Sequence, residues 1–176
     1  MKKNLTVRAL FCSLLLSFFG SEALAVDCTG QCSATILPAI SGSKATQTAT
    51  GGDLAFGTIM PSASSGSVTI APDTATRTAS GGVQLVTSVF GPAVFNITGA
   101  ANSSYSVTLP SDGTITISNG NQAMSVTGFS AAPASGVATL NGDGVGAFKV
   151  GGKLDVPANQ PSGEYTGMFD VIVTYQ

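Results

Sequence analysis

Residues 105–126 read YSVTLPSDGTITISNGNQAMSV, and no other stretch is as informative about the class of fold. Apolar side chains stand two residues apart in three short runs, which begin at Tyr105, Ile115 and Met124. Successive side chains of a β-strand point to opposite faces, so this spacing places each set on one face of a strand. Asp112-Gly113 and Asn119-Gly120 separate the runs, and such pairs readily adopt the positive φ of tight hairpin turns. The stretch therefore predicts antiparallel strands joined by short turns.

The same pattern extends in both directions along the chain. Runs rich in Val, Ile, Phe, Tyr and Thr alternate with turn residues about every ten positions, a spacing typical of all-β domains. The predicted strands are Ala34–Ile40, Leu54–Met60, Ser67–Ile70, Val83–Val86, Ala93–Thr98, Tyr105–Leu109, Thr114–Ser118, Ala123–Phe129, Val137–Leu140, Ala147–Val156 and Glu164–Tyr175. After residue 25, no twelve-residue stretch has the 3.6-residue period of an amphipathic helix. We expect an all-β fold of about 9–11 strands, packed as an antiparallel β-sandwich, with closure into a small barrel as the alternative.

The first 25 residues have the features of a cleaved secretory signal peptide. Lys2, Lys3 and Arg8 precede an apolar core, and Ala23-Leu24-Ala25 matches the small-residue cleavage site. The apolar core is shorter than the ~20 residues that a membrane-spanning helix needs, so we expect no stable membrane insertion. The sequence thus predicts three parts: the signal peptide (1–25), an N-terminal segment with a small, polar linker over Ser41–Gly52 (26–52), and a β-sandwich domain (53–176) in an exported protein.

Cys28 and Cys32 form a candidate disulfide in the exported chain. An oxidising compartment allows a disulfide to persist. In an extended strand their Cα atoms would be about 13 Å apart, too far for a bridge, so pairing within the chain requires a turn at Thr29-Gly30-Gln31. Pairing between chains is the alternative. The spacing has one residue more than the C-x-x-C of redox proteins, so we expect no redox chemistry.

Composition excludes several classes of function. The 176 residues are 43% hydrophobic and only 9% charged, and they include no histidine. Without histidine, imidazole-based catalytic triads and the commonest metal ligand are missing. Four basic residues against eight acidic ones after residue 25 offer no cluster for nucleic-acid phosphates. We expect no cofactor, metal site or catalytic residue; the alternative is a hydrolase that uses scattered carboxylates such as Asp53, Glu164 and Asp170.

Both ends of the predicted mature chain carry strands suited to assembly. Phe169, Val171, Val173 and Tyr175 alternate up to the penultimate residue. A strand in that position either lies inside a sheet or offers an unpaired edge. At the other end Ala34, Ile36 and Ile40 also alternate, but Pro38 between them lacks an N–H and favours an edge strand.

These ends and several internal motifs carry a resemblance to a known family. The C-terminal pattern, with Gly163 fourteenth from the end and an aromatic Tyr175 next to last, resembles the end of chaperone–usher pilus subunits. Four ordered motifs over about Ala34–Tyr175 resemble domain-of-unknown-function family 4402, which is similar to fimbrial major subunits and to spore-coat U type proteins. They are Leu54-Ala-Phe56-Gly57-Thr58-Ile59, Ala93-Val-Phe95-Asn-Ile97-Thr-Gly99, Phe148-Lys-Val150-Gly151-Gly152-Lys-Leu154 and Gly163-Glu-Tyr165-Thr-Gly167-Met-Phe169.

The resemblance implies an immunoglobulin-like, pilin-like sandwich that polymerises at the cell surface by donor-strand exchange. A periplasmic chaperone and an outer-membrane usher would be partners beside like subunits. By position, Ala34, Ile36 and Ile40 would be the donated side chains, with an acceptor groove along Gly163, Tyr165, Phe169, Val171, Val173 and Tyr175. The mode of recognition would be β-augmentation, in which an extended segment adds a strand to an exposed sheet edge.

A different class of function remains open. Ala34–Ile40 is equally suited to be the first strand of a self-complete sandwich, and the C-terminal alternation is then ordinary core packing. Such a domain would be a secreted coat or ligand-binding module, because a fold does not determine a function.

Overall fold

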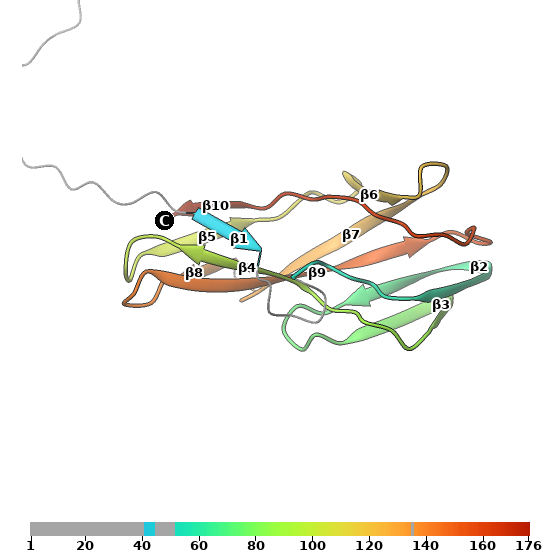
Figure 1. The fold of residues 1–176 in the computed structure, drawn as a ribbon, viewed down its shortest axis with the longest axis horizontal. Coiled ribbons are helices and arrows are strands. Elements are labelled where there is room, and N and C mark those ends of the chain that lie inside the picture. The colour runs from blue at the N-terminus through green and yellow to red at the C-terminus, as the bar shows by residue number, and fades with distance from the viewer. Residues whose placement is uncertain (1–40, 45–51, 135) are drawn as a thin grey trace, which may run out of the picture. The chain divides into compact units, whose positions relative to one another are not determined.

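The computed structural model describes residues 41–44, 52–134 and 136–176, which form ten β-strands and no helix (Figure 1). The expected all-β class is thus confirmed. The strands are β1 (Ser41–Lys44), β2 (Ile59–Ile70), β3 (Arg77–Leu85), β4 (Ala93–Thr98), β5 (Ser104–Thr108), β6 (Ile115–Ser118), β7 (Ala123–Ala132), β8 (Val137–Thr139), β9 (Val145–Val156) and β10 (Ile172–Tyr175). All the pairings between these strands are antiparallel.

The strands form a seven-stranded and a three-stranded sheet, the arrangement of a β-sandwich. The long strand β9 is the centre of the larger sheet. One edge of β9 pairs with β4 over its first half and with β2 over its second half, while β7 pairs with the other edge. Strands β1, β3 and β6 lie outside β4, β2 and β7, respectively. The smaller sheet has the order β10-β5-β8.

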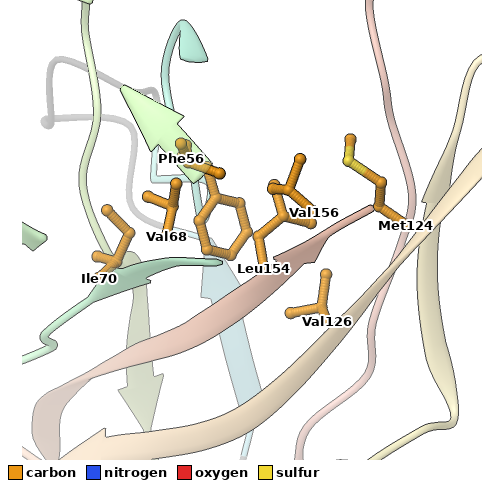
Figure 2. Packing of buried hydrophobic residues seen from close by; sticks show 8 residues of the cluster. Phe56, Val68, Ile70, Met124, Val126, Leu154 and Val156 are labelled. Carbon is orange, nitrogen blue, oxygen red and sulfur yellow. The ribbon is translucent and has the colours of Figure 1, made fainter. Parts of the chain in front are cut away.

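Alternating apolar residues of both sheets build two core clusters. The first cluster contains Phe56, Val68, Ile70, Val83, Met124, Val126, Leu154 and Val156 (Figure 2). The second contains Ala93, Ile97, Tyr105, Leu140, Phe148 and Val150. The alternating sets that begin at Tyr105, Ile115 and Met124 face the core. Tyr105, Met124 and Val126 are buried, and Val107, Leu109, Ile115 and Ile117 pack against the clusters as partly buried side chains.

The β2–β3 hairpin folds back on itself. Its pairing register shifts between Pro61 and Gly66, and Gly81 on β3 has the left-handed φ of +69° at this point. Arg77 pairs with Ile70 near the tip of the hairpin, yet its guanidinium donates to the carbonyl oxygens of Phe56 (2.9 Å) and Val86 (2.8 Å), which flank the opposite end of the ladder. The two ends of the hairpin are therefore held together by one side chain.

Several predicted boundaries were wrong, those of β1 and β3 among them, and the continuous β2 replaces the predicted strands Leu54–Met60 and Ser67–Ile70. Residues 41–44 were assigned to the linker, but they form β1 and pair with Thr98 to Phe95 of β4. Their small, polar sequence hid the strand, because pairing at a sheet edge uses main-chain groups and needs no apolar row. Strand β3 begins at Arg77 rather than Val83, since small residues over 78–82 gave no alternating pattern.

Candidate functional site

The C-terminal segment, residues 163–176, is the candidate functional site. It was predicted as a strand over Glu164–Tyr175, but only Ile172–Tyr175 pairs along β5. Nearer its start, Thr166 exchanges two backbone hydrogen bonds with Ser118 of β6, at 2.8 and 3.0 Å. Between these two contacts the main chain is not part of a ladder.

Proline explains why the ladder stops. The backbone N–H of Gln176 donates to Ser104 at 3.0 Å, so the hydrogen-bonded pairs continue as Thr174 with Ser106 and Ile172 with Thr108. The next pair in this series would join Asp170 to Pro110. Because proline has no N–H, it cannot donate to Asp170, and the regular pairing ends there.

The alternating apolar side chains of the segment lie against the core. Phe169, Val171, Val173 and Tyr175 pack against the second core cluster, and each remains partly exposed. The ring of Phe169 meets Phe95 edge-on at 6.2 Å between centroids and lies 5.3 Å from Phe129. Tyr165 packs against the first cluster instead. The segment therefore spans both clusters.

Tyr175 is fixed at the end of the segment by a contact with the loop after β4. Its hydroxyl oxygen accepts a hydrogen bond from the backbone N–H of Ala100 at 2.7 Å. A Cβ added at Gly99 would collide with that hydroxyl and lie 2.9 Å from Leu140 Cδ1. Glycine at position 99 thus leaves the space that Tyr175 fills.

Tyr165 is fixed at the beginning of the segment by its own hydroxyl. This hydroxyl donates to the carbonyl oxygen of Pro161, four residues earlier, at 2.8 Å. It also accepts a hydrogen bond from Nε2 of the buried Gln160 at 3.0 Å. Gly163 lies in the turn between these residues, where an added Cβ would be 3.0 Å from Nδ2 of Asn119. The alternating pattern and the family resemblance place Tyr165 in the groove, and nothing in the sequence indicates this local anchor.

Strand β10 is the end strand of the smaller sheet. Its ladder partner is β5, and within the described residues no strand pairs with its other side. Because Thr174 and Ile172 direct their main-chain groups toward β5, Val173 directs its N–H and carbonyl away from β5. On the outer face, Met168 and Ile172 are exposed. The segment thus combines a main-chain edge with a partly exposed apolar row.

Apolar side chains predominate along the segment, and such side chains suit packing against another apolar surface. Within the ranges that the structure describes, no three His, Cys, Asp or Glu side chains are grouped to hold a metal ion. The described residues also contain no helix long and apolar enough to cross a membrane.

The structure also contains a hollow of about 410 Å³, which the sequence did not reveal. It is lined by Val107, Leu109, Phe129, Ser130, Ala131, Ala134 and Gly136.

The remaining predicted site residues lie outside the described residues. They are the candidate donor side chains Ala34, Ile36 and Ile40 and the candidate disulfide Cys28–Cys32, together with the predicted signal peptide. The first described residue is Ser41, directly after Ile40, and it begins β1 in the larger sheet.

Comparison with known proteins identifies a family without a known function. The family model for a domain of unknown function, DUF4402, matches residues 44–175, which is about three quarters of the chain. The chain therefore belongs to the DUF4402 family. No curated protein and no solved structure matches it.

Proposed function

We propose that this DUF4402 protein is an exported, non-enzymatic subunit of a fimbrial or pilus-like fibre, assembled by insertion of one subunit's N-terminal strand beside β10 of the next. The proposal rests on one observation above all: β10 is the end strand of a three-stranded sheet and has an outward main-chain edge at Val173. The exported state itself rests on the sequence of residues 1–25.

The order of strands supports an immunoglobulin-like sandwich that lacks its last strand. In such sandwiches, strands A, B, E and D form one sheet and C, F and G form the other. Strands β1-β4-β9-β7 match A-B-E-D in order and pairing, and β5-β10 match C-F. On this alignment strand G would lie on the side of β10 away from β5. Within the described residues no strand pairs with that side of β10, and on this proposal a neighbouring subunit supplies strand G.

The hydroxyl anchor of Tyr165 supports the same alignment. Immunoglobulin-like domains carry a tyrosine near the start of strand F whose hydroxyl bonds to the main chain a few residues upstream. Tyr165 lies between β9 and β10, seven residues before β10 begins, and its hydroxyl donates to Pro161. Gln160, buried beneath the corner, donates to the same hydroxyl.

The inserted segment we propose is 33–40 of a neighbouring subunit. An added strand satisfies the main-chain edge, and its alternate side chains cover the apolar row that one sheet edge leaves partly exposed. Ala34, Ile36 and Ile40 would be those side chains, and Phe169, Val171 and Val173 would form the row they cover. During export a periplasmic chaperone would shield this row, and an outer-membrane usher would bring successive subunits together.

The test uses the full chain, exported to a bacterial periplasm and examined on detergent gels without boiling. Strand-exchanged polymers dissociate slowly, so we expect a ladder of bands that boiling collapses. Ile36→Asp should abolish the ladder by placing a charge in the apolar row. Thr35→Asp changes the neighbouring side chain, on the opposite face of the same strand, and should preserve it. A ladder that persists in Ile36→Asp, or a wild-type chain with no ladder, refutes the proposal.

A self-complete coat or ligand-binding module is the second candidate. It is favoured by β1, which pairs with β4 of its own domain immediately after the candidate donor segment. If residues 34–40 complete their own sandwich, the wild-type chain will be a monomer, and Ile36→Asp will lower its unfolding midpoint in urea instead of removing a polymer.

A further inference from the structure

The hollow of about 410 Å³ has walls from both sheets. Strand β7 of the larger sheet lines it, together with residues in and next to β5 and β8 of the smaller sheet. Most of the lining side chains are apolar, and none is charged; the apolar ones are Val107, Leu109, Phe129, Ala131 and Ala134. The hollow therefore suits an uncharged, apolar side chain better than a charged one.

The outer edge of β7, which faces away from β9, has a different neighbour along each part of its length. Strand β6 pairs only with Ala123–Val126 (Figure 1). Further along, the N–H of Gly128 donates to the carboxylate of Asp112 at 2.7 Å. The last part of β7 borders the hollow, and within the described residues no strand pairs with its outer edge there.

The hydrogen-bonding pattern of the larger sheet determines where Ala131 directs its main-chain groups. The Gly99 N–H donates to the carbonyl of Gly144 at 2.9 Å and continues the ladder of β4 and β9. Because hydrogen-bonded pairs alternate along an antiparallel ladder, Ala93 and Val150 form such a pair. Val150 thus directs its N–H and carbonyl toward β4, while Ala131 lies opposite it on the other edge of β9. The N–H and carbonyl of Ala131 therefore point away from β9, toward the outer edge.

These two groups of Ala131 are suited to a peptide backbone. Ala131 is only 9% exposed, and within the described residues neither its N–H nor its carbonyl has a hydrogen-bond partner. Main-chain polar groups in such places are normally paired. One residue of an antiparallel strand supplies both a donor and an acceptor on the same side. A single amide group does not, because its N–H and carbonyl point in opposite directions.

The smaller sheet also stops pairing at the hollow. The Val107 N–H donates to the carbonyl of Gly136 at 2.7 Å, which continues the ladder of β5 and β8. The next pair in this series would join Leu109 to Ala134, and both residues line the hollow. Within the described part of the chain no hydrogen bond joins these two residues. The hollow thus lies where both walls lack ladder partners.

We propose that this hollow is a docking site for an extended, uncharged peptide segment of a partner protein. The segment would add to β7 opposite Ala131, in line with β6, by β-augmentation. Residues directly opposite each other in an antiparallel pair have side chains on the same face, so the residue paired with Ala131 would direct an apolar side chain into the hollow. This site lies on a different strand from β10, and the proposal goes beyond fibre assembly.

The experiment uses a short synthetic peptide and the full exported chain. The probe is fluorescein-Ser-Thr-Leu-Thr-Ser-amide, and its fluorescence anisotropy is followed as the chain is added to about 1 mM, because short peptides bind weakly. We expect saturable binding. The same peptide with Asp in place of Leu should bind at least about tenfold more weakly, because its carboxylate would enter an apolar hollow.

Two variants of the chain test the place of binding. Ala131→Pro removes the outward N–H, which is not part of the ladder with β9, and should weaken binding by about tenfold. Ala134→Phe changes an exposed residue, fills the hollow and should weaken binding by at least about tenfold. The matched control is Thr139→Pro on β8, which also removes an outward N–H from an edge strand and should leave binding unchanged.

Each outcome decides the proposal. Weaker binding in Ala131→Pro and Ala134→Phe, but not in Thr139→Pro, supports it. Wild-type binding in Ala134→Phe overturns it, even if Ala131→Pro fails to fold. A wild-type chain that does not bind the peptide also overturns it; if the Ile36→Asp chain then binds, the occupant is the chain's own N-terminal segment. The detergent-resistant ladder that tests strand insertion at β10 should be unchanged in Ala134→Phe, so the two proposals can fail separately.

Discussion

The hydroxyl of Tyr175 occupies the space that a side chain at Gly99 would need, and its oxygen accepts the N–H of the next residue, Ala100, at 2.7 Å. The penultimate residue is thereby joined to the loop after β4, which is remote in sequence. Glycine 99 and Tyr175 depend on each other: the absence of a Cβ makes room for the ring, and the ring satisfies a main-chain donor.

This relationship predicts strong coupling between the two positions. Tyr175→Phe leaves the Ala100 N–H without its acceptor and should lower the free energy of unfolding by about 1–2 kcal/mol. Gly99→Ala forces the ring aside and should cost about 1–3 kcal/mol. In the double variant the collision is partly relieved, so its cost should be less than the sum of the two single costs. Urea unfolding of the four proteins measures the coupling, and simple additivity would contradict it.

The hydroxyl of Tyr165 provides a second prediction. Tyr165→Phe removes both the hydrogen bond to Pro161 and the acceptor for buried Gln160 Nε2. We expect a loss of about 1–3 kcal/mol in unfolding free energy, because a buried amide loses its partner. A double variant with Gln160→Leu and Tyr165→Phe also removes the unpaired amide. It should therefore be less destabilised than the single variant Tyr165→Phe. An unchanged midpoint in Tyr165→Phe would show that the corner is not a structural anchor.

The third prediction is that the side-chain contacts of Arg77 stabilise the folded-back β2–β3 hairpin. Arg77→Lys should lower the unfolding free energy by about 2 kcal/mol, because an ammonium group cannot donate to both Phe56 and Val86 while lying over Phe90. Lys153→Met is the control. It removes only the surface ion pair with Asp155, at 3.1 Å, and should change stability by less than about 0.5 kcal/mol. Equal effects of the two substitutions would refute the role of Arg77.

Tyr105 provides a prediction on pH. Burial raises the pKa of the Tyr105 phenol above its ordinary value of 10.0. The unfolded chain therefore releases this proton at a lower pH than the folded chain does. The corresponding stability is fully present below about pH 10 and is lost as the pH rises through the folded-state pKa. Urea midpoints measured across this range should fall more steeply for the wild type than for Tyr105→Phe, and parallel curves would contradict the expected shift.

Much of the fold was predictable from the sequence, because each core strand carries its own alternating pattern. Tyr105, Met124 and Val126 are buried as that pattern required. Strand β1 was not predictable in this way, since its pairing with β4 uses main-chain groups and leaves no mark on side-chain polarity. Strand β10 begins at Ile172, later than predicted, because Pro110 lies opposite Asp170. The sequence contains this proline, but its effect can be recognised only once the register between β5 and β10 is known.

The candidate site was foreseen in part. Alternation placed Phe169, Val171, Val173 and Tyr175 on one face of the C-terminal segment, and all four pack against the second core cluster. It could not reveal the contacts of the two tyrosine hydroxyls, because Ala100 is 75 residues from Tyr175 in the sequence and Pro161 is an ordinary turn residue. The folded hairpin was also hidden, since it depends on a register shift opposite Gly81 and on the reach of one arginine.

The last segment is fastened at its two ends, by Tyr165 and Tyr175, and its middle lacks a main-chain ladder. A strand bound along β10 would transmit a pulling force parallel to the segment. The hydrogen bonds to β5 would then be loaded together in shear, whereas a force across the sheet would open them one after another. Mechanical resistance of the joint would thus depend on the direction of pull, and the hydrogen bond from the Ala100 N–H to the Tyr175 hydroxyl would carry part of the load beside the β5 ladder.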